Sequence, residues 1–183
     1  IYQNNRKNRH LEIAEQLIQK DLAYKCYSTK QEIDDFKKTA QAIGKSTKFI
    51  SPWRTKRLTR NNSMDYVVRL RVPEKSQTVI EDRVQGIVSW QNDNLDDLIL
   101  LRSDGTATYN LAAVVDDYDS KVSHIIRGDD HLANTPKQKL IYESLGWDIP
   151  LFAHIPLIHG TDGKKLSKRH GAVGLNHYQK MGI

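Results

Sequence analysis

The second half of the chain alternates strand-like and helix-like segments, which limits its possible folds more than any other feature. DDLILL (96–101) is a continuous apolar run after acids, as in a buried central strand. YNLAAVVDD (109–117) has helical spacing, SHIIR (123–127) is strand-like, TPKQKLIYESLG (135–146) is a helix with an early proline and a final glycine, and FAHIPLI (152–158) is a third strand. Strand, helix, strand, helix, strand is the order of a parallel sheet, so we predict the α/β class.

The first half of the chain has a different pattern of predicted helices and strands. Apolar residues recur at helical spacing from residue 6 to 20, and LAYKCYS (22–28) alternates like a strand. Thr29 and Glu32 form a capping-box pattern for a helix that Gly44 stops. Three short β-branched segments predict strands of a small, mostly antiparallel unit: DYVVRLRV (65–72), QTVIEDRV (77–84) and GIVSW (86–90).

The charge of the chain favours polyanionic partners without requiring them. Lys and Arg exceed Asp and Glu by 28 − 22 = 6, and residues 45–63 carry six cations and no acid. This segment fits contact with nucleic-acid phosphates, and a solvated loop fits it equally well. Cys26 is the only cysteine, which excludes a disulfide framework, and no apolar run approaches the length of a membrane span. We therefore expect a soluble, cytoplasmic protein.

The stretch GKKLSKRHGA (163–172) places four cations within six residues and brackets them with glycines. It follows a predicted strand, and loops at the carboxyl ends of parallel strands are where α/β proteins bind ligands. Glycines let the backbone approach a triphosphate, Lys165 and Lys168 could neutralise it, and Ser167 could donate a hydrogen bond. A solvated basic loop remains the commoner explanation of two lysines at this spacing.

Two further stretches contain candidate ligand-binding side chains. Arg127 ends a predicted strand, where its planar fork could bind a carboxylate, or it could pair with Asp129 or Asp130 while Thr135 caps the next helix. A metal site with His131 is a third alternative, although three adjacent ligands on one loop have poor geometry.

Tyr109 begins a predicted helix after a strand. Its hydroxyl could reach a ligand, and packing of the ring into the core is the alternative. The lysine cluster at 164–168 suits the phosphates of an anionic nucleotide. The guanidinium of Arg127 and the hydroxyl of Tyr109 suit an acidic amino acid.

Three blocks in this order resemble a known family. KLSKRHGA (165–172) resembles the KMSKS-type signature of class I aminoacyl-tRNA synthetases, in the form of bacterial glutamyl-tRNA synthetases. TYNLAAVVDD (108–117) and HIIRGDDHLANTP (124–136) resemble two more blocks of that family, and LAYKCYS (22–28) is similar to the segment entering its acceptor-end-binding insertion. The similarity covers nearly the whole chain apart from residues 45–63.

The resemblance implies the second half of a Rossmann-like class I catalytic fold with an inserted small α/β acceptor-stem-binding domain. The expected division is residues 1–21 as the end of the first half of the catalytic fold, 22–95 as the insertion, 96–160 as the second half, and 161–183 as the KLSKR loop with the start of a stem-contact region. It also implies attachment of L-glutamate to tRNA(Glu) through a glutamyl-adenylate, with ATP and Mg²⁺, by a cytoplasmic monomer.

The same resemblance implies roles for individual residues. Tyr109 and Arg127 would contact glutamate, with Arg127 binding its side-chain carboxylate, and Asp130 and Ile158 would hold the adenosine part of ATP. The mobile ATP-binding loop would comprise Lys165, Leu166, Ser167, Lys168 and Arg169. Of these, Lys165, Lys168 and Arg169 would be catalytic, with Lys168 stabilising the transition state at phosphorus and the departing pyrophosphate.

The sequence also departs from the family pattern. It contains no H-x-G-H signature, which in the family stabilises the same transition state, so we expect a fragment. Ser28 stands where some members have a second zinc-binding cysteine, so no zinc is expected at Cys26. At Asp129 and Asp130 the family often has glutamate. A transferase acting on a modified tRNA base, a glutaminyl-tRNA synthetase and a noncatalytic RNA-binding module remain alternatives.

Overall fold

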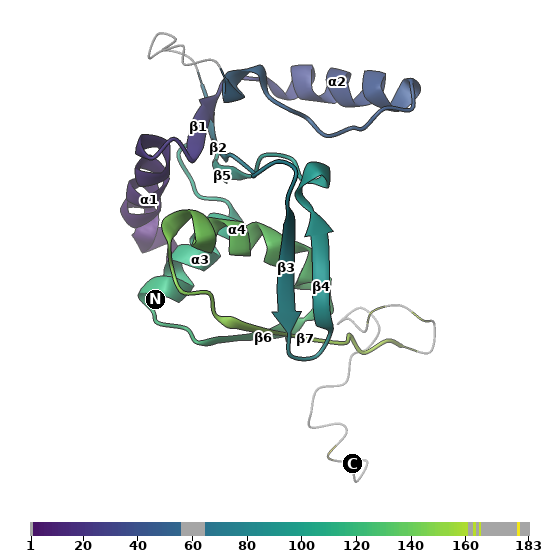
Figure 1. Cartoon of the computed structure of the whole chain (residues 1–183). Coiled ribbons are helices and arrows are strands. Elements are labelled where there is room, and N and C mark those ends of the chain that lie inside the picture. Colours follow the sequence, from purple (N-terminus) through teal and green to yellow (C-terminus); the bar gives the residue numbers. More distant parts are fainter. Residues whose placement is uncertain (1, 56–64, 161–162, 164, 166–178, 180–183) are drawn as a thin grey trace.

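A computed structural model describes residues 2–55, 65–160, 163, 165 and 179, and shows a mixed α/β architecture (Figure 1). The helices are η1 (Gln3–Arg6), α1 (Lys7–Gln19), α2 (Lys30–Ala42), η2 (Pro52–Arg54), η3 (Asn92–Asn94), α3 (Tyr109–Asp119), η4 (Asp129–Asn134) and α4 (Thr135–Leu145). The strands are β1 (Ala23–Cys26), β2 (Val67–Leu70), β3 (Gln77–Asp82), β4 (Gly86–Gln91), β5 (Ile99–Leu101), β6 (His124–Gly128) and β7 (Leu151–Ile155). No helix in these ranges is long and apolar enough to cross a membrane.

The strands form two sheets with different pairing. One has the order β1-β2-β5 and is antiparallel. The other has the order β4-β3-β7-β6, in which β4 pairs antiparallel with β3, and β7 pairs parallel with both β3 and β6. The predicted parallel unit is confirmed for β6, α4 and β7, and its strands end at the same edge of the sheet.

The prediction that DDLILL forms a central strand of the parallel sheet is wrong. β5 lies at the edge of the antiparallel sheet, where it pairs with β2. Leu100 and Leu101 are nonetheless buried, because helices α1 and α3 pack against β5. A continuous apolar run indicates that a strand is buried. It does not indicate whether helices or neighbouring parallel strands cover that strand.

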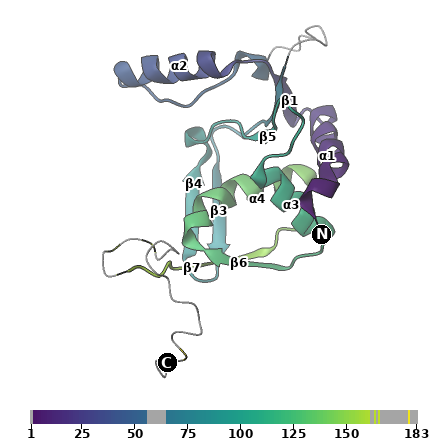
Figure 2. The same cartoon turned by 180° about the vertical axis from the view of Figure 1, so that it is seen from behind.

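The three strands predicted between residues 65 and 90 do not form a separate antiparallel unit. β2 and β3 belong to different sheets, and both sheets combine strands from either side of residue 95. The long hairpin of β3 and β4 runs beside α4, as both views show (Figures 1 and 2). Lys139 of α4 donates to the carbonyl oxygen of Val79 in β3 at 2.6 Å.

Local signals in the sequence set the helix ends correctly. The capping box of α2 is present, with the Thr29 hydroxyl accepting from the Glu32 N–H at 3.2 Å and the Glu32 carboxylate accepting from the Thr29 N–H at 2.7 Å. Gly146 ends α4 in the left-handed conformation, at φ 69°. Helix α2 extends away from the rest of the chain (Figure 1), and of its residues only Ala40 is buried.

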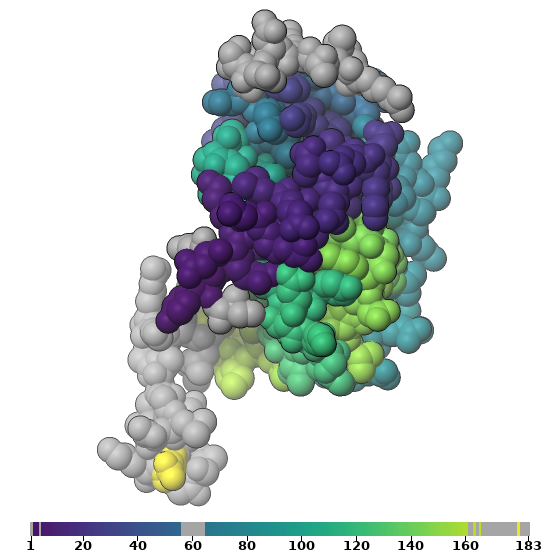
Figure 3. Space-filling view, turned by 90° about the vertical axis from the view of Figure 1, so that its left-hand side faces the viewer, coloured from purple at the N-terminus to yellow at the C-terminus, as the bar shows by residue number. Residues whose placement is uncertain are grey.

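The main core lies between the antiparallel sheet and helices α1, α3 and α4. Leu17, Leu70, Leu100, Leu111 and Ile141 are all less than 1% exposed within it. On the surface, ion pairs join the N-terminal helices to α3: Arg6 of η1 contacts Asp116 and Asp119, and Arg9 of α1 contacts Asp119. Figure 3 shows the purple N-terminal residues adjoining the green residues of the later helices on one face.

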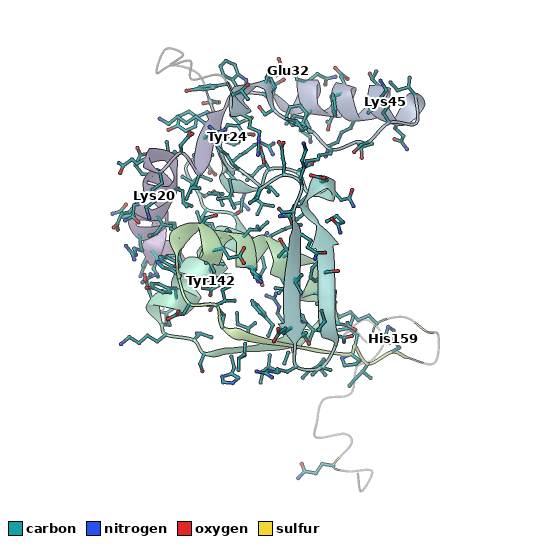
Figure 4. All side chains as sticks on the ribbon, in the orientation of Figure 1. Lys20, Tyr24, Glu32, Lys45, Tyr142 and His159 are labelled. Atoms are coloured by element: carbon teal, nitrogen blue, oxygen red, sulfur yellow. The ribbon has the colours of Figure 1, made fainter. Side chains whose placement is uncertain are left out.

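Tyr142 is a buried side chain whose replacement should stabilise the fold. It is 1% exposed and lies in the middle of the molecule (Figure 4), and its hydroxyl has no hydrogen-bond partner within the described ranges. Burial, and then the nearby charge of Asp117, raise the pKa of Tyr142. Because Tyr142→Phe removes an unsatisfied hydroxyl, we expect the free energy of unfolding to rise by about 1 kcal/mol, measured by urea denaturation.

Tyr24 provides the matched control. It is also buried, but its hydroxyl donates to a carboxylate oxygen of Asp97 at 2.7 Å. Tyr24→Phe should therefore lower the free energy of unfolding by about 1–2 kcal/mol. Destabilisation by both substitutions to the same extent would contradict the assignment of the Tyr142 hydroxyl as unsatisfied.

Candidate functional site

Arg127 occupies the carboxyl end of β6, at the edge of the sheet where parallel strands present ligand-binding loops. Its Nε donates to Nε2 of His154 at 3.0 Å, and its Nη2 donates to the Thr135 hydroxyl at 2.9 Å and to the His131 carbonyl at 3.4 Å. No partner for Nη1 occurs in the described part of the chain. The side chain is half-buried and held on one edge, which leaves Nη1 available to an anionic ligand.

The alternative in which Arg127 pairs with Asp129 or Asp130 is wrong. Among the described residues, Arg127 forms no ion pair with either carboxylate. Thr135 does not cap α4 with its side chain, because its hydroxyl faces Arg127 and His154 instead. Asp117 lies close enough for Arg127 to lower its pKa, although burial and the neighbouring Asp116 raise that pKa by more.

Tyr109 is the first residue of α3 and is 48% exposed, so its ring is not a core side chain. Its ring lies 6.0 Å from that of His131, centre to centre. The His131 carbonyl in turn accepts from Arg127. The structure therefore brings both predicted glutamate contacts, Tyr109 and Arg127, next to His131.

Asp130 and Lys165, both predicted to bind ATP, form an ion pair although they are 35 residues apart. The hydrogen bond from Lys165 lowers the pKa of Asp130. Glycine at position 128 makes room for the Asp130 carboxyl group, since a Cβ there would lie 2.6 Å from Asp130 Oδ1. His159 pairs with Lys165 in an isolated antiparallel bridge. The chain after β7 thus returns to the loop after β6.

The remaining predicted residues divide into two groups. Ile158 follows β7 and is 73% exposed, so the residue is accessible to a ligand. Four residues of the predicted loop lie outside the described ranges: Leu166, Ser167, Lys168 and Arg169. Their predicted roles therefore stay predictions.

A pocket of about 500 Å³ opens beside the antiparallel sheet, between residues of β2 and β5 and the start of α3. Thr108 and Asn110, which flank Tyr109, line one side of it. Four cations also line it: Lys37, Lys48, Arg69 and Lys137. Lys37 pairs with Asp96 at 3.1 Å, and Arg69 donates to the backbone carbonyl of Asp97. The pocket is therefore polar, basic and continuous with the N-terminal end of α3.

Two buried residues behind Arg127 were missed in the sequence. Nδ1 of His154 in β7 lies 2.6 Å from Oδ2 of Asp82 in β3, and neither side chain is exposed. Burial alone would raise the pKa of Asp82, but hydrogen bonds from the Gln85 N–H, His154 and the Val84 N–H hold it well below its usual value. The alternation of β3 carried a signal, since Asp82 falls on the same buried face as Thr78 and Ile80.

The described residues contain no side-chain cluster suited to a metal ion. No three His, Cys, Asp or Glu side chains lie together in a way that could hold a metal ion there, so Asp129, Asp130 and His131 do not form such a site. Cys26 is buried, and its sulfur lies 3.2 Å from the Ser51 hydroxyl.

Comparison with known protein families agrees with the resemblance seen in the sequence. The model of the family described as "tRNA synthetases class I (E and Q), catalytic domain" matches residues 1–183. The chain belongs to this family of class I tRNA synthetases. The predicted family is thereby confirmed, and the predicted α/β fold class agrees with it.

Curated class I synthetases resemble the chain over its whole length. Glutamate–tRNA ligase 1 of Cereibacter sphaeroides is 54% identical over 182 residues, which cover 100% of this chain and 39% of that protein. Glutamate–tRNA ligase 2 of Paracoccus denitrificans is 56% identical over 176 residues, or 96% of this chain and 38% of that protein. The chain therefore spans less than half the length of these synthetases.

Solved synthetase structures share the fold. A glutamate tRNA ligase from Elizabethkingia meningosepticum, crystallised in complex with its amino acid, superimposes with a TM-score of 0.79 at 32% identity, covering 92% of this chain and 36% of that one. The glutamate-tRNA synthetase of Elizabethkingia anophelis gives 0.77 at 30% identity, covering 92% and 37%. The α/β fold of the chain thus matches the corresponding part of these solved glutamate–tRNA ligases.

Proposed function

We propose that the chain takes part in the ATP-dependent attachment of L-glutamate to tRNA(Glu) through a glutamyl-adenylate. The observation that carries this proposal is the gathering of Tyr109, Arg127, Asp130 and Lys165 around the carboxyl ends of β6 and β7. These side chains supply a carboxylate-binding guanidinium and an ammonium group for phosphate. The names of the relatives, all glutamate–tRNA ligases, support glutamate as the amino acid.

Tyr109 and Arg127 would bind glutamate, with the free Nη1 of Arg127 facing its side-chain carboxylate. Asp130 and the backbone at Ile158 would hold the adenosine part of ATP, while Lys165, Lys168 and Arg169 act on the phosphates with Mg²⁺. Lys165 is paired with Asp130 and would exchange that partner for phosphate oxygens when ATP binds. Catalysis would then depend on position and charge, without a covalent enzyme intermediate.

The tRNA would approach along the basic pocket. Lys37 of α2 and Lys48 line it on one side, together with Arg69 of β2 and Lys137 of α4. This agrees with an acceptor-end-binding role for residues 22–95, beside a catalytic part in residues 96–160. The enzyme is proposed to work as a cytoplasmic monomer that uses no zinc at Cys26.

Glutamate-dependent exchange between ATP and pyrophosphate tests the proposal. The complete protein that contains this chain should catalyse exchange with glutamate and charge tRNA(Glu). The isolated 183 residues contain no H-x-G-H signature, and loss of such a transition-state contact costs about 100- to 1000-fold, so they should give little exchange. Exchange by the complete protein that depends on glutamine, or on no amino acid, would contradict the proposal. Robust exchange by the isolated chain would show that these residues suffice.

A further inference from the structure

Three neighbouring strands place Asp82, His154 and Arg127 in one hydrogen-bonded row across the sheet. His154 lies opposite Arg127 in the register of β6 and β7, and β3 pairs with β7 at Asp82. The backbone N–H of His154 donates to Asp82 Oδ1 at 3.1 Å, its Nδ1 lies 2.6 Å from Oδ2, and its Nε2 lies 3.0 Å from Nε of Arg127. His154 is 0% exposed and Asp82 is 5% exposed.

The contacts define which nitrogen of His154 carries the proton. Nε of arginine always bears a hydrogen, so the imidazole nitrogen facing Arg127 must accept. Nε2 of His154 is therefore unprotonated, and Nδ1 carries the proton and donates it to the Asp82 carboxylate. The Thr135 hydroxyl, 3.1 Å from the same Nε2, can also donate to it while accepting from Arg127.

The row leaves Arg127 little freedom to turn. Its Nε is held by His154 and its Nη2 by Thr135, while its guanidinium carbon lies 5.7 Å from the ring centre of Phe152. The Phe152 ring is stacked near that of His154 on the same face of β7. Only the Nη1 end of the fork has no partner among the described residues, so its direction is set by the groups behind it.

We propose that Asp82 and His154 are positioning residues that orient the guanidinium of Arg127 toward the amino-acid substrate. The inference rests on the proposed role of Arg127 in binding glutamate. Asp82 fixes the tautomer of His154, and His154 presents a lone pair to Arg127 Nε. Since Asp82 belongs to the β3–β4 hairpin, this hairpin contributes to the amino-acid site although it reaches no substrate itself.

Two substitutions of His154 in the complete protein separate this role from a purely structural one. In His154→Gln, the amide oxygen can take the place of Nε2 and accept from Arg127. In His154→Asn, the shorter amide can still donate to Asp82 but cannot reach Arg127. Both remove the same buried ring, so a structural role predicts equal effects.

We expect His154→Asn to raise the KM for glutamate by about 10-fold or more, because a misdirected binding group loses contact with the substrate carboxylate. For His154→Gln the expected change in this KM is less than about 3-fold, and kcat and the KM for ATP should stay within about 3-fold in both variants. Equal glutamate KM values for the two variants would overturn the proposal.

Asp82→Asn tests the other end of the row. Three backbone N–H groups, of Val84, Gln85 and His154, donate to Oδ1, so the amide oxygen must occupy that place and the NH₂ group must face Nδ1. The proton of His154 should move to Nε2, opposite the N–H of Arg127. The glutamate KM should rise by about 10-fold, as for His154→Asn, whereas Glu81→Gln, an exposed neighbour on β3, should leave it unchanged.

Nitrogen NMR of His154 provides a measurement that does not depend on activity. The wild-type complete protein should show a proton on Nδ1, and a proton on Nε2 would overturn the proposal even if no variant folds. The Arg127→Ala variant separates the proposed role of Arg127 in binding glutamate from the proposed role of His154 in positioning Arg127. An unchanged glutamate KM in that variant contradicts the role of Arg127 itself. A raised KM there, combined with a normal one in His154→Asn, contradicts only the positioning role.

Discussion

Replacing Arg127 by alanine in the complete protein is expected to raise the KM for glutamate by about 100- to 1000-fold. A buried or half-buried guanidinium that binds a carboxylate contributes several kcal/mol, because both ions have left water to meet. The substitution also leaves His154 Nε2 and the Thr135 hydroxyl without their donor. The measurement is steady-state aminoacylation of tRNA(Glu) at varied glutamate concentration.

Arg83→Ala is the matched control for Arg127→Ala. Arg83 follows β3, is exposed, and forms no side-chain hydrogen bond or ion pair in the described part of the chain. Its removal should change the glutamate KM by less than about 2-fold, as is usual for surface substitutions. If Arg127→Ala lowered kcat and left the glutamate KM at the wild-type value, Arg127 would act on the reaction and not on glutamate binding.

Lys168→Ala is expected to lower the rate of adenylate formation by about 100- to 1000-fold, with little change in the glutamate KM. The prediction follows from the position of Lys168 in the KLSKR block. The family resemblance implies that this lysine stabilises the negative charge that develops on phosphate in the transition state. An interaction made mainly in the transition state changes kcat and leaves substrate binding intact. Single-turnover formation of glutamyl-adenylate measures this step directly.

Lys20→Ala serves as the control for a lost lysine charge. Lys20 follows α1 and is exposed far from the strand ends of β6 and β7 (Figure 4), so the rate should be that of the wild type. A large rise in glutamate KM for Lys168→Ala, without loss of adenylate formation at saturating glutamate, would contradict the assignment to the phosphate-handling step.

The sequence was sufficient for features that depend on residues a few positions apart. The helices α1, α3 and α4 follow from apolar spacing, and the start of α2 follows from Thr29 and Glu32. Tyr109, Arg127 and Lys165 could also be chosen as candidate ligand-binding residues, because each stands in a motif block, and their roles stay predictions. Gly128 stood within such a block, but its close approach to Asp130 was visible only in the structure.

Strand pairing is where reasoning from the sequence failed. The apolar run of β5 suggested a central parallel strand, and β3 suggested a member of a local antiparallel unit. The pattern of apolar and polar side chains along a strand indicates how deeply the strand is buried and which of its faces is covered. This pattern does not indicate which strand is the pairing partner, because every strand offers the same backbone N–H and C=O groups.

The sequence by itself determined the family of this protein, the presence of helices α1 to α4, and the residues proposed to meet glutamate and ATP. Those features come from local backbone preferences and from side-chain chemistry that a short motif retains. Only the tertiary structure decided that Asp82 supports His154 and that His154 supports Arg127. These contacts join residues 72 and 27 positions apart, and they exist because β7 lies between β3 and β6 in the sheet.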